Sequence, residues 1–251
     1  MGEGLHISLA QEPLGFFLGL PITASLITSW IVVAILLIAG FFIGRNLKLI
    51  PGKGQVALEE LISTLYKYVK DTLEDAKLAE RYFPLITTIF LFVVLANLLG
   101  QFPGMESIGF HNAEGKLIPL FYPVNADLNI PLALAIISFL TIEISGIVYL
   151  GFFKYAGKFI NFKSPIDFFI GILEIIGNLA RLISLSFRLF GNIFAGEVLL
   201  IITGFLAPFL APIPFLMLEI FVGFIQALVF SMLTLVFLSI AVENHAEHCT
   251  G

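Results

Sequence analysis

The sequence predicts an all-α integral membrane protein with about five transmembrane helices and one interfacial amphipathic helix. Of its 251 residues, 59% are hydrophobic and 12% are charged, and the mean hydropathy is +1.02. A soluble domain usually carries about 25% charged residues. A membrane span needs about 20 apolar residues, so the chain can hold five or six spans. We treat residues 1–251 as a single membrane domain.

The composition also restricts the kinds of function. The single cysteine, Cys249, lies two residues from the end, so disulfides and cysteine-based metal sites have no support. The net charge is −5, and no basic surface of the kind that binds nucleic acid is present. Residues 1–21 contain no Lys or Arg and therefore lack the basic region of a signal peptide. We expect no cofactor, no metal and no nucleic-acid partner.

The first span is predicted at residues 22–44, which form the first long apolar run. The segment 45–81 follows it and carries many basic residues, so the positive-inside rule places this segment in the cytoplasm and residues 1–21 outside. Apolar residues from Leu58 to Ala76 recur at helical spacing, which is typical of an amphipathic helix on a membrane surface. An ordinary helix packed on a soluble partner is the alternative. The basic residues are Arg45, Lys48, Lys53, Lys67, Lys70, Lys77 and Arg81.

Residues 82–153 are predicted to form a hairpin of two spans. Pro84 suits the first turn of a helix, and the apolar run that follows it ends near Gly100. Residues 101–128 are polar and hold a single basic residue, so we expect an external loop. The next span is predicted from about residue 129 to residue 153.

Residues 165–242 are predicted to form a long, tilted helical hairpin. Its first arm, residues 166–206, would be roughly 60 Å long as a helix, whereas the hydrocarbon core is about 30 Å thick. The arm must therefore tilt, bend or protrude. The uncharged, proline-rich segment 207–214 ends the first arm, and residues 215–242 form the second arm, which crosses back through the membrane. The tail, residues 243–251, is expected to be cytoplasmic.

Arg188 is the most unusual residue of the first arm. It lies near the middle of the apolar stretch 182–200. A guanidinium group cannot be neutralised in a protein, and burying one at mid-membrane costs roughly 3 kcal/mol on insertion scales. We expect such a cation to serve a function inside the membrane. A structural cation that pairs with a carboxylate of its own chain is the alternative.

A polar stripe accompanies Arg188. Positions seven apart on a helix differ by about 20°, so Glu174, Arg181 and Arg188 share one face. Glu174 and Arg181 lie near the cytoplasmic end of this helix, where they are candidates for an inner path for ions. Alternatively, their side chains extend to the membrane surface and serve no such path. Glu143 lies inside the preceding span, and the sequence identifies no partner for it. The remaining members of the stripe are Asn178, Ser184 and Asn192.

The returning arm supplies further polar residues. If the hairpin folds about Ala207, Gln226 lies at the depth of Arg188, and Glu219 lies at nearly the depth of Glu197. Glu197 points about 180° away from Arg188. Carboxylates exchange protons and the arginine does not, so the pattern predicts two offset proton paths separated by a fixed cation. Alternatively, Glu197 and Glu219 are satisfied polar groups near the outer interface.

Several motifs resemble one known family. RLFGN at 188–192, followed by AGE at 195–197, is similar to the signature of subunit a of the F-type ATP synthases. Other segments resemble the family as well, over most of the chain. They are IPGKGQVALEEL at 50–61, ANLLGQFP at 96–103, PVNADLNIPLALA at 123–135 and IQALVFSMLTLVFLS at 225–239.

The resemblance implies a non-catalytic stator subunit that faces a rotating ring of c subunits. Its other expected partners are the peripheral-stalk b subunits, the remaining ATP synthase subunits and lipid, in a bacterial inner membrane. Arg188 matches the family's essential arginine, which attracts the ring carboxylate in its ionised form and blocks proton leakage between half-channels. Some family members carry His where this chain has Glu219, so here the outer pair would be two carboxylates with coupled titration. The positions that match the family's outer half-channel or lie near its arginine are Asn192, Glu197, Glu219 and Gln226.

Two other classes of protein are less well supported. A stand-alone secondary transporter would show repeated halves with helices interrupted at matching places, and the sequence shows neither. An intramembrane protease would need a Ser–His or Asp–Asp arrangement inside the spans. The predicted spans contain no His, and Asp167 lies at a helix start. Under the ATP synthase hypothesis, the choice between proton and sodium is expected to lie in the ring.

Overall fold

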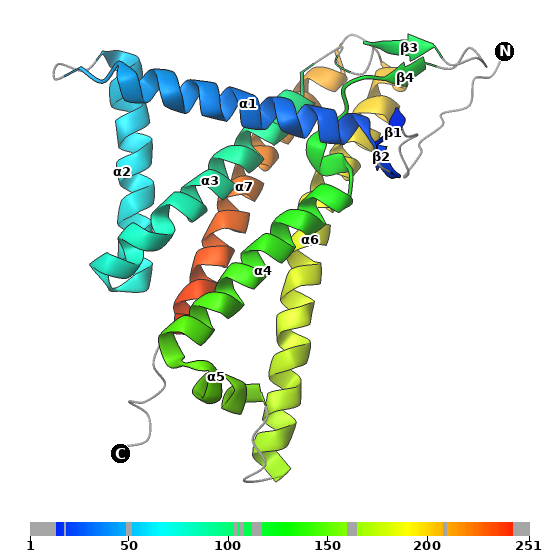
Figure 1. Ribbon diagram of the computed structural model, residues 1–251. Coiled ribbons are helices and arrows are strands. Elements are labelled where there is room, and N and C mark those ends of the chain that lie inside the picture. Colours follow the sequence, from blue (N-terminus) through cyan, green and yellow to red (C-terminus); the bar gives the residue numbers. More distant parts are fainter. Residues whose placement is uncertain are drawn as a thin grey trace.

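The computed structural model is built almost entirely of helices, with two small β-hairpins near one end (Figure 1). Its description covers residues 14–17, 19–48, 52–102, 105, 108–111, 117–159, 165–207 and 210–242. The cytoplasmic tail predicted at 243–251 and most of the predicted external N-terminus lie outside these ranges.

Within the described ranges, five helices are long and apolar enough to cross a membrane. This finding confirms the predicted fold class, an all-α integral membrane protein. The five are α1 (Ala24–Arg45), α3 (Ala76–Gly100), α4 (Asn129–Leu150), α6 (Pro165–Leu206) and α7 (Pro212–Val242).

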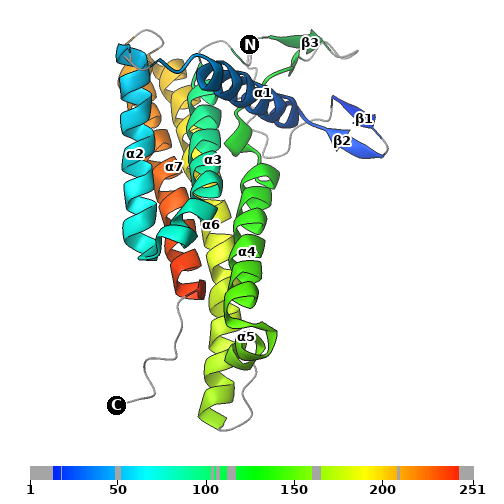
Figure 2. The same ribbon diagram turned by 60° about the vertical axis from the view of Figure 1, so that its left-hand side comes forward.

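Helix α1 lies at a steep angle to the other long helices in both views (Figures 1 and 2). Its first turn is capped by Thr23, whose side chain accepts a hydrogen bond from the backbone N–H of Leu26. Val32 is fully buried against α3 and the short 3-10 helix Val124–Ala126 (η2). Most of the remaining apolar surface of α1 is exposed, so lipid or another protein must cover it in a membrane.

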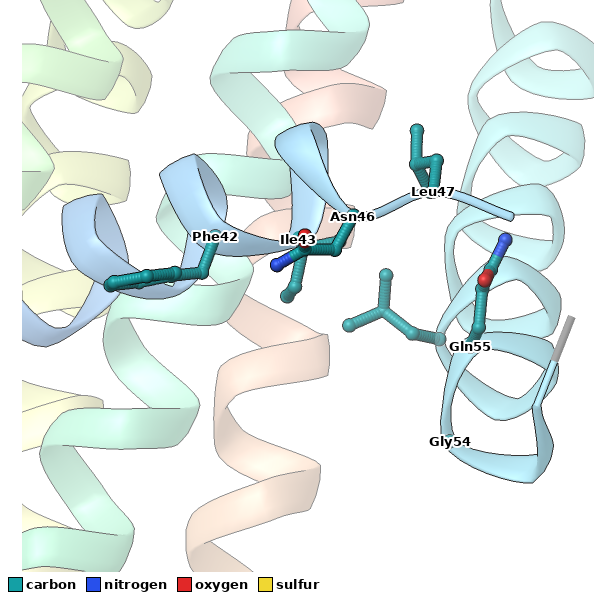
Figure 3. A pocket seen from close by; sticks show the side chains of 7 residues that line it. Phe42, Ile43, Asn46, Leu47, Gly54 and Gln55 are labelled. Atoms are coloured by element: carbon teal, nitrogen blue, oxygen red, sulfur yellow. The ribbon is translucent and has the colours of Figure 1, made fainter.

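Helix α2 (Lys53–Leu73) follows α1 after a sharp corner. Gln55 holds the corner, because its amide donates to the carbonyl oxygen of Lys48 and accepts from the N–H of Lys48. A groove of about 340 Å³ separates the two helix ends at this point (Figure 3). Leu65, Val69 and Leu73 are buried and the rest of α2 is largely exposed, so the predicted amphipathic helix is present.

Helix α3 begins at Ala76, so the prediction that Pro84 lies in its first turn is wrong. Glu74 adopts a left-handed conformation with φ of 53° and ends α2. Asp75 then caps α3, because its carboxylate accepts a hydrogen bond from a backbone N–H of the first turn. Pro84 is therefore inside the helix, where it cannot donate to the carbonyl oxygen of Glu80.

The predicted external loop 101–128 contains structure that the sequence did not predict. Strands β3 (Gly109–His111) and β4 (Leu117–Pro119) pair in an antiparallel hairpin within it. A second hairpin, β1 (Gly15–Phe17) with β2 (Leu20–Ile22), precedes α1. Both hairpins lie toward the same end of the helical bundle (Figure 1).

Helix α4 ends at Leu150, three residues earlier than predicted. Gly151 follows with a positive φ of 80° and turns the chain into a short helix, α5 (Phe152–Phe159). Gly146 lets α5 fold back, since a Cβ atom at this position would overlap the ring of Tyr155. The sequence did not separate the start of α5 from the end of α4, because Phe152 and Phe153 continue the apolar run of α4.

The core lies where α3, α4, α6 and α7 pack side by side (Figure 2). Phe90, Leu189 and Phe230 are among its largest fully buried side chains. Helix α6 has 42 residues and is therefore about 63 Å long. That is about twice the thickness of a hydrocarbon core, so α6 must tilt, bend or protrude from the membrane.

Candidate functional site

The hairpin of α6 and α7 has two ends, and polar residues gather near each. We call the end where α6 passes into α7, between Leu206 and Pro212, the turn end. We call the opposite end, where α6 begins and α7 finishes, the open end. Helix α5 lies beside the open end (Figure 1).

Arg188 lies on the exposed side of α6, between the two ends. Its neighbours Leu185 and Leu189 are buried on the adjoining side of the helix, where they anchor it in the core. In the part of the chain that the structure describes, Arg188 forms no ion pair or hydrogen bond. Ser184 and Asn192, one turn away on either side, are also exposed. The cation therefore faces outward from this chain.

Asn192 and Gln226 join the two arms of the hairpin. The side-chain amide of Asn192 donates to Oε1 of Gln226 at 2.7 Å. Gln226 is buried, and its amide nitrogen has no hydrogen-bond partner among the residues described. The sequence placed Gln226 at the depth of Arg188, whereas Gln226 contacts Asn192, which lies one turn closer to the turn end.

Glu219 is buried between α7 and α6, with 7% of its surface exposed. Gly196 of α6 faces it so closely that a Cβ atom there would overlap the carboxylate. Gln101 lies beside the carboxylate, but no hydrogen bond of standard geometry links Glu219 to any described residue. Gly196 leaves a space between the helices, and the Glu219 carboxylate occupies it without a hydrogen-bond donor of standard geometry among the described residues.

Glu197 has a definite partner in a loop. The hydroxyl group of Tyr122 donates to Oε1 of Glu197 at 2.6 Å. Tyr122 is itself held by α1, because its backbone N–H donates to the hydroxyl of Thr28 at 3.2 Å. Tyr122 could not be identified from the sequence, since loop residues carry no periodic signal. We call the following set the turn-end cluster: Tyr122, Asn192, Glu197, Glu219 and Gln226.

Two buried asparagines fix α3 and η2 against α7 near this cluster. Asn97 donates to the backbone carbonyl of Gly223 at 2.8 Å, and Asn125 donates to Oδ1 of Asn97 at 2.6 Å. Both side chains are almost fully buried. Asn97 is a polar residue in an apolar span, and this signal could have identified it from sequence.

A second set of residues, the open-end cluster, surrounds Glu143 of α4. The hydroxyl of Tyr155 donates to its Oε2 at 2.8 Å, and the amide of Asn178 donates to its Oε1 at 3.2 Å. Arg181 donates to Oδ1 of Asn178 at 2.9 Å and lies over the ring of Phe237, 4.7 Å from its centre. The cluster consists of Glu143, Tyr155, Asn178 and Arg181.

Burial, reinforced by the neighbouring carboxylates Glu143 and Glu174, raises the pKa of the Tyr155 hydroxyl. Tyr155 therefore keeps its proton and remains a donor. Glu174 is half-buried, and its charge acts on this cluster. Ser184 points to the exposed side of α6 and is not part of the cluster. Among the residues described, no group of three or more His, Cys, Asp and Glu could hold a metal ion.

Comparison with known proteins places the chain in a family. Residues 26–239 match the sequence model of the family described as ATP synthase A chain. The chain belongs to this family. It is 36% identical over 218 residues to ATP synthase subunit a 3 of Pelobacter propionicus, which covers 86% of each chain. It is 37% identical over 238 residues to ATP synthase subunit a of Desulfosudis oleivorans, which covers 93% of this chain and 94% of that one.

Membership of the ATP synthase A chain family fixes the coarse function. The chain is a multi-pass membrane subunit of an F-type ATP synthase and works within that complex. Both clusters lie inside the matched range. The site residues predicted from sequence are thus divided by the fold into a turn-end group, an open-end group and the outward-facing pair Arg188 and Ser184.

Proposed function

We propose that this chain is the proton-translocating stator subunit of its ATP synthase, with Arg188 as the cation that separates two half-channels. The observation that carries the proposal is the position of Arg188, exposed on α6 between two polar clusters and without an ion-pair partner among the described residues. A permanent cation inside a membrane span, with no partner in the described part of its own chain, needs an anion from another molecule. A carboxylate on a ring of c subunits supplies that anion.

The outer half-channel is formed by the turn-end cluster. Glu219 and Glu197 are the groups that exchange protons, and Asn192 and Gln226 lie between these acids and the level of Arg188. The space opposite Gly196 lets the Glu219 side chain move as it binds and releases a proton.

The inner half-channel begins at the open end. Glu174, Asn178, Arg181 and Ser184 lie along α6 between this end and Arg188. An ionised ring carboxylate passes Arg188 between the two half-channels because the cation stabilises its charge. The same cation repels a proton that would otherwise cross directly between them. The chain itself catalyses no chemical step on ATP.

The partners of the chain are the c-subunit ring, the peripheral-stalk b subunits, the other subunits of the complex and lipid. The exposed apolar side of α1 supports contacts with lipid or a neighbouring subunit. The chain lies in a bacterial plasma membrane with its N-terminus outside. The basic residues of 45–81 support placing the α1–α2 corner in the cytoplasm.

Thiol labelling tests this orientation. Cys249, which lies beyond the described residues, is the only cysteine in the chain. A membrane-impermeant thiol reagent should label it in inside-out vesicles and leave it unlabelled in right-side-out vesicles. The reverse pattern would overturn the orientation.

Replacement of Arg188 tests the mechanism. Arg188→Ala should abolish ATP-driven proton pumping in reconstituted vesicles while the complex still assembles, and it should open a passive proton leak. Arg188→Lys should fail as well, because an ammonium group lacks the planar fork and can lose its proton when buried. Arg45→Ala, which removes an exposed cation from the end of α1, is the matched control. Pumping by Arg188→Ala at the wild-type rate would show that the arginine is structural.

A further inference from the structure

A carboxylate that the proposed function does not use lies inside a membrane span. Glu143 is the fifteenth residue of the 22-residue helix α4, and no other acid or base occurs in that helix. An ionisable side chain at such a position is costly and is usually functional. The hydrogen bonds around Glu143 and a neighbouring cavity point to the same role.

Both carboxylate oxygens of Glu143 accept hydrogen bonds. Their donors, Tyr155 and the amide of Asn178, come from two different helices. Since Tyr155 keeps its proton, this arrangement fits the ionised carboxylate. Each carboxylate oxygen has more than one lone pair, so Glu143 can accept a further hydrogen bond or a proton without losing either donor.

A small cavity adjoins the open-end cluster between α4, α6 and α7. Its volume is about 20 Å³, and Ser138, Glu143, Asn178 and Arg181 contribute its polar lining. About 10–15 Å³ suffices for one water molecule if polar partners are present. Leu185, which also lines the cavity, is three residues from Arg188, so the cavity lies between Glu143 and the turn that carries the arginine.

Ser138 provides an independent indication of a ligand in this cavity. Only 1% of its surface is exposed, and its hydroxyl oxygen has no hydrogen-bond partner in the described part of the chain. A buried hydroxyl without a partner costs about 1–3 kcal/mol. A water molecule in the cavity would remove this cost, because it could bond to Ser138 and to the Glu143 carboxylate together.

Charged groups come close to Glu143 from the helices packed against it. Helix α5 contributes neutral Tyr155 and carries the exposed Lys154, and α6 contributes Glu174 and Arg181. Helix α7 contributes the ring of Phe237, since its one titratable residue, Glu219, lies near the turn end. The guanidinium of Arg181 bonds to the same Asn178 that donates to Glu143, so a permanent cation is fixed beside the carboxylate.

We propose that Glu143 and a water molecule held by Ser138 form the proton-exchange site of the inner half-channel. This inference rests on the proposed function. A proton bound to a carboxylate oxygen of Glu143 passes to the cytoplasm, and a proton arriving through the cavity water takes its place. Only O–H bonds form and break. Asn178 and Arg181 position the carboxylate and balance its charge.

Passive proton conduction through the membrane sector, measured in vesicles while the pH on the open-end side is varied, tests the inference. Glu143→Gln should lower conduction by roughly 100-fold and remove its dependence on that pH. Glu143→Asp should restore part of both. Ser138→Ala should lower conduction although Glu143 is intact. If the Glu143→Gln variant fails to assemble, the conduction of Ser138→Ala tests the exchange site instead. Ser145→Ala is the control, because its hydroxyl bonds to the carbonyl of Thr141 and does not line the cavity.

Two outcomes separate this inference from the proposed function. If Arg188→Ala abolishes pumping but Glu143→Gln and Ser138→Ala keep wild-type conduction and pH dependence, the exchange site is wrong and the stator proposal stands. If Arg188→Ala pumps normally, the stator proposal itself fails. A loss of conduction in Glu143→Gln with an unchanged pH profile would mean that Glu143 is only structural.

Discussion

The two ends of the α6–α7 hairpin hold their carboxylates in opposite ways. At the turn end, Glu219 is buried opposite a glycine and forms no standard hydrogen bond within the described residues. At the open end, Glu143 accepts a hydrogen bond on each oxygen from a different helix. Glu219 is positioned by the shape of the space around it, and Glu143 is positioned by hydrogen-bond donors. The turn end should therefore be sensitive to added volume, and the open end to lost hydrogen bonds.

Gly196→Ala should have the largest effect on the turn end. The added Cβ atom would overlap the Glu219 carboxylate and force that side chain to a new position. A misplacement of about 1 Å can cost on the order of 100-fold in rate, so we expect ATP-driven proton pumping to fall by about that factor. Gly204→Ala, in open space on the same helix, is the control. Equal pumping by the two variants would show that the shape around Glu219 does not matter.

Tyr122→Phe should have an intermediate effect. It removes one hydrogen bond to the Glu197 carboxylate and leaves the ring in place. A hydrogen bond to a charged group contributes about 1.5–3 kcal/mol, so we expect proton-driven ATP synthesis to fall by at least about tenfold and its dependence on outside pH to shift. Tyr68→Phe, on the exposed side of α2, should behave as wild type. An unchanged outside-pH profile in Tyr122→Phe would remove the tyrosine from the outer half-channel.

Phe237→Leu should have the smallest effect, at the open end. It removes the aromatic ring beneath Arg181 but keeps every hydrogen bond of the open-end cluster. Arg181 and Phe237 are both only partly buried, and a cation–π contact that is not fully desolvated is worth about 0.5–1 kcal/mol, so proton pumping should fall by no more than about fivefold. Phe41→Leu removes a comparable contact with Arg45, at 5.1 Å, in an exposed position and should change nothing. A larger loss in Phe237→Leu than in Tyr122→Phe would reverse the proposed ranking.

The five spans could be predicted from the sequence, because they follow from runs of apolar residues. Counting from a turn at Ala207 placed Gln226 within one helical turn of its partner, Asn192. The same count placed Glu219 beside Glu197, and the structure puts it against the adjacent Gly196. In a regular helix each residue advances by a fixed rise, so the number of residues from the turn gives the depth of a residue along either arm.

Contacts between distant segments could not be predicted in this way. Tyr122 and Asn125 bond to their partners from a loop, and the path of a loop cannot be predicted from sequence periodicity. Tyr155 reaches Glu143 only because the chain reverses after Gly151. The start of α3 differs from the predicted start for a local reason. The carboxylate of Asp75 caps the helix, and this capping signal outweighed the preference of Pro84 for a first turn.

The return of α5 onto α4 has a consequence for sequence variation among relatives. Gly146 and Gly151 are constrained for different reasons: the first by the ring of Tyr155, and the second by its own positive φ. A relative with a small side chain at the position of Tyr155 is therefore free to carry Ala at the position of Gly146, whereas glycine at the position of Gly151 should persist. Positions 146 and 155 should thus vary together across the family, independently of the residues around Arg188.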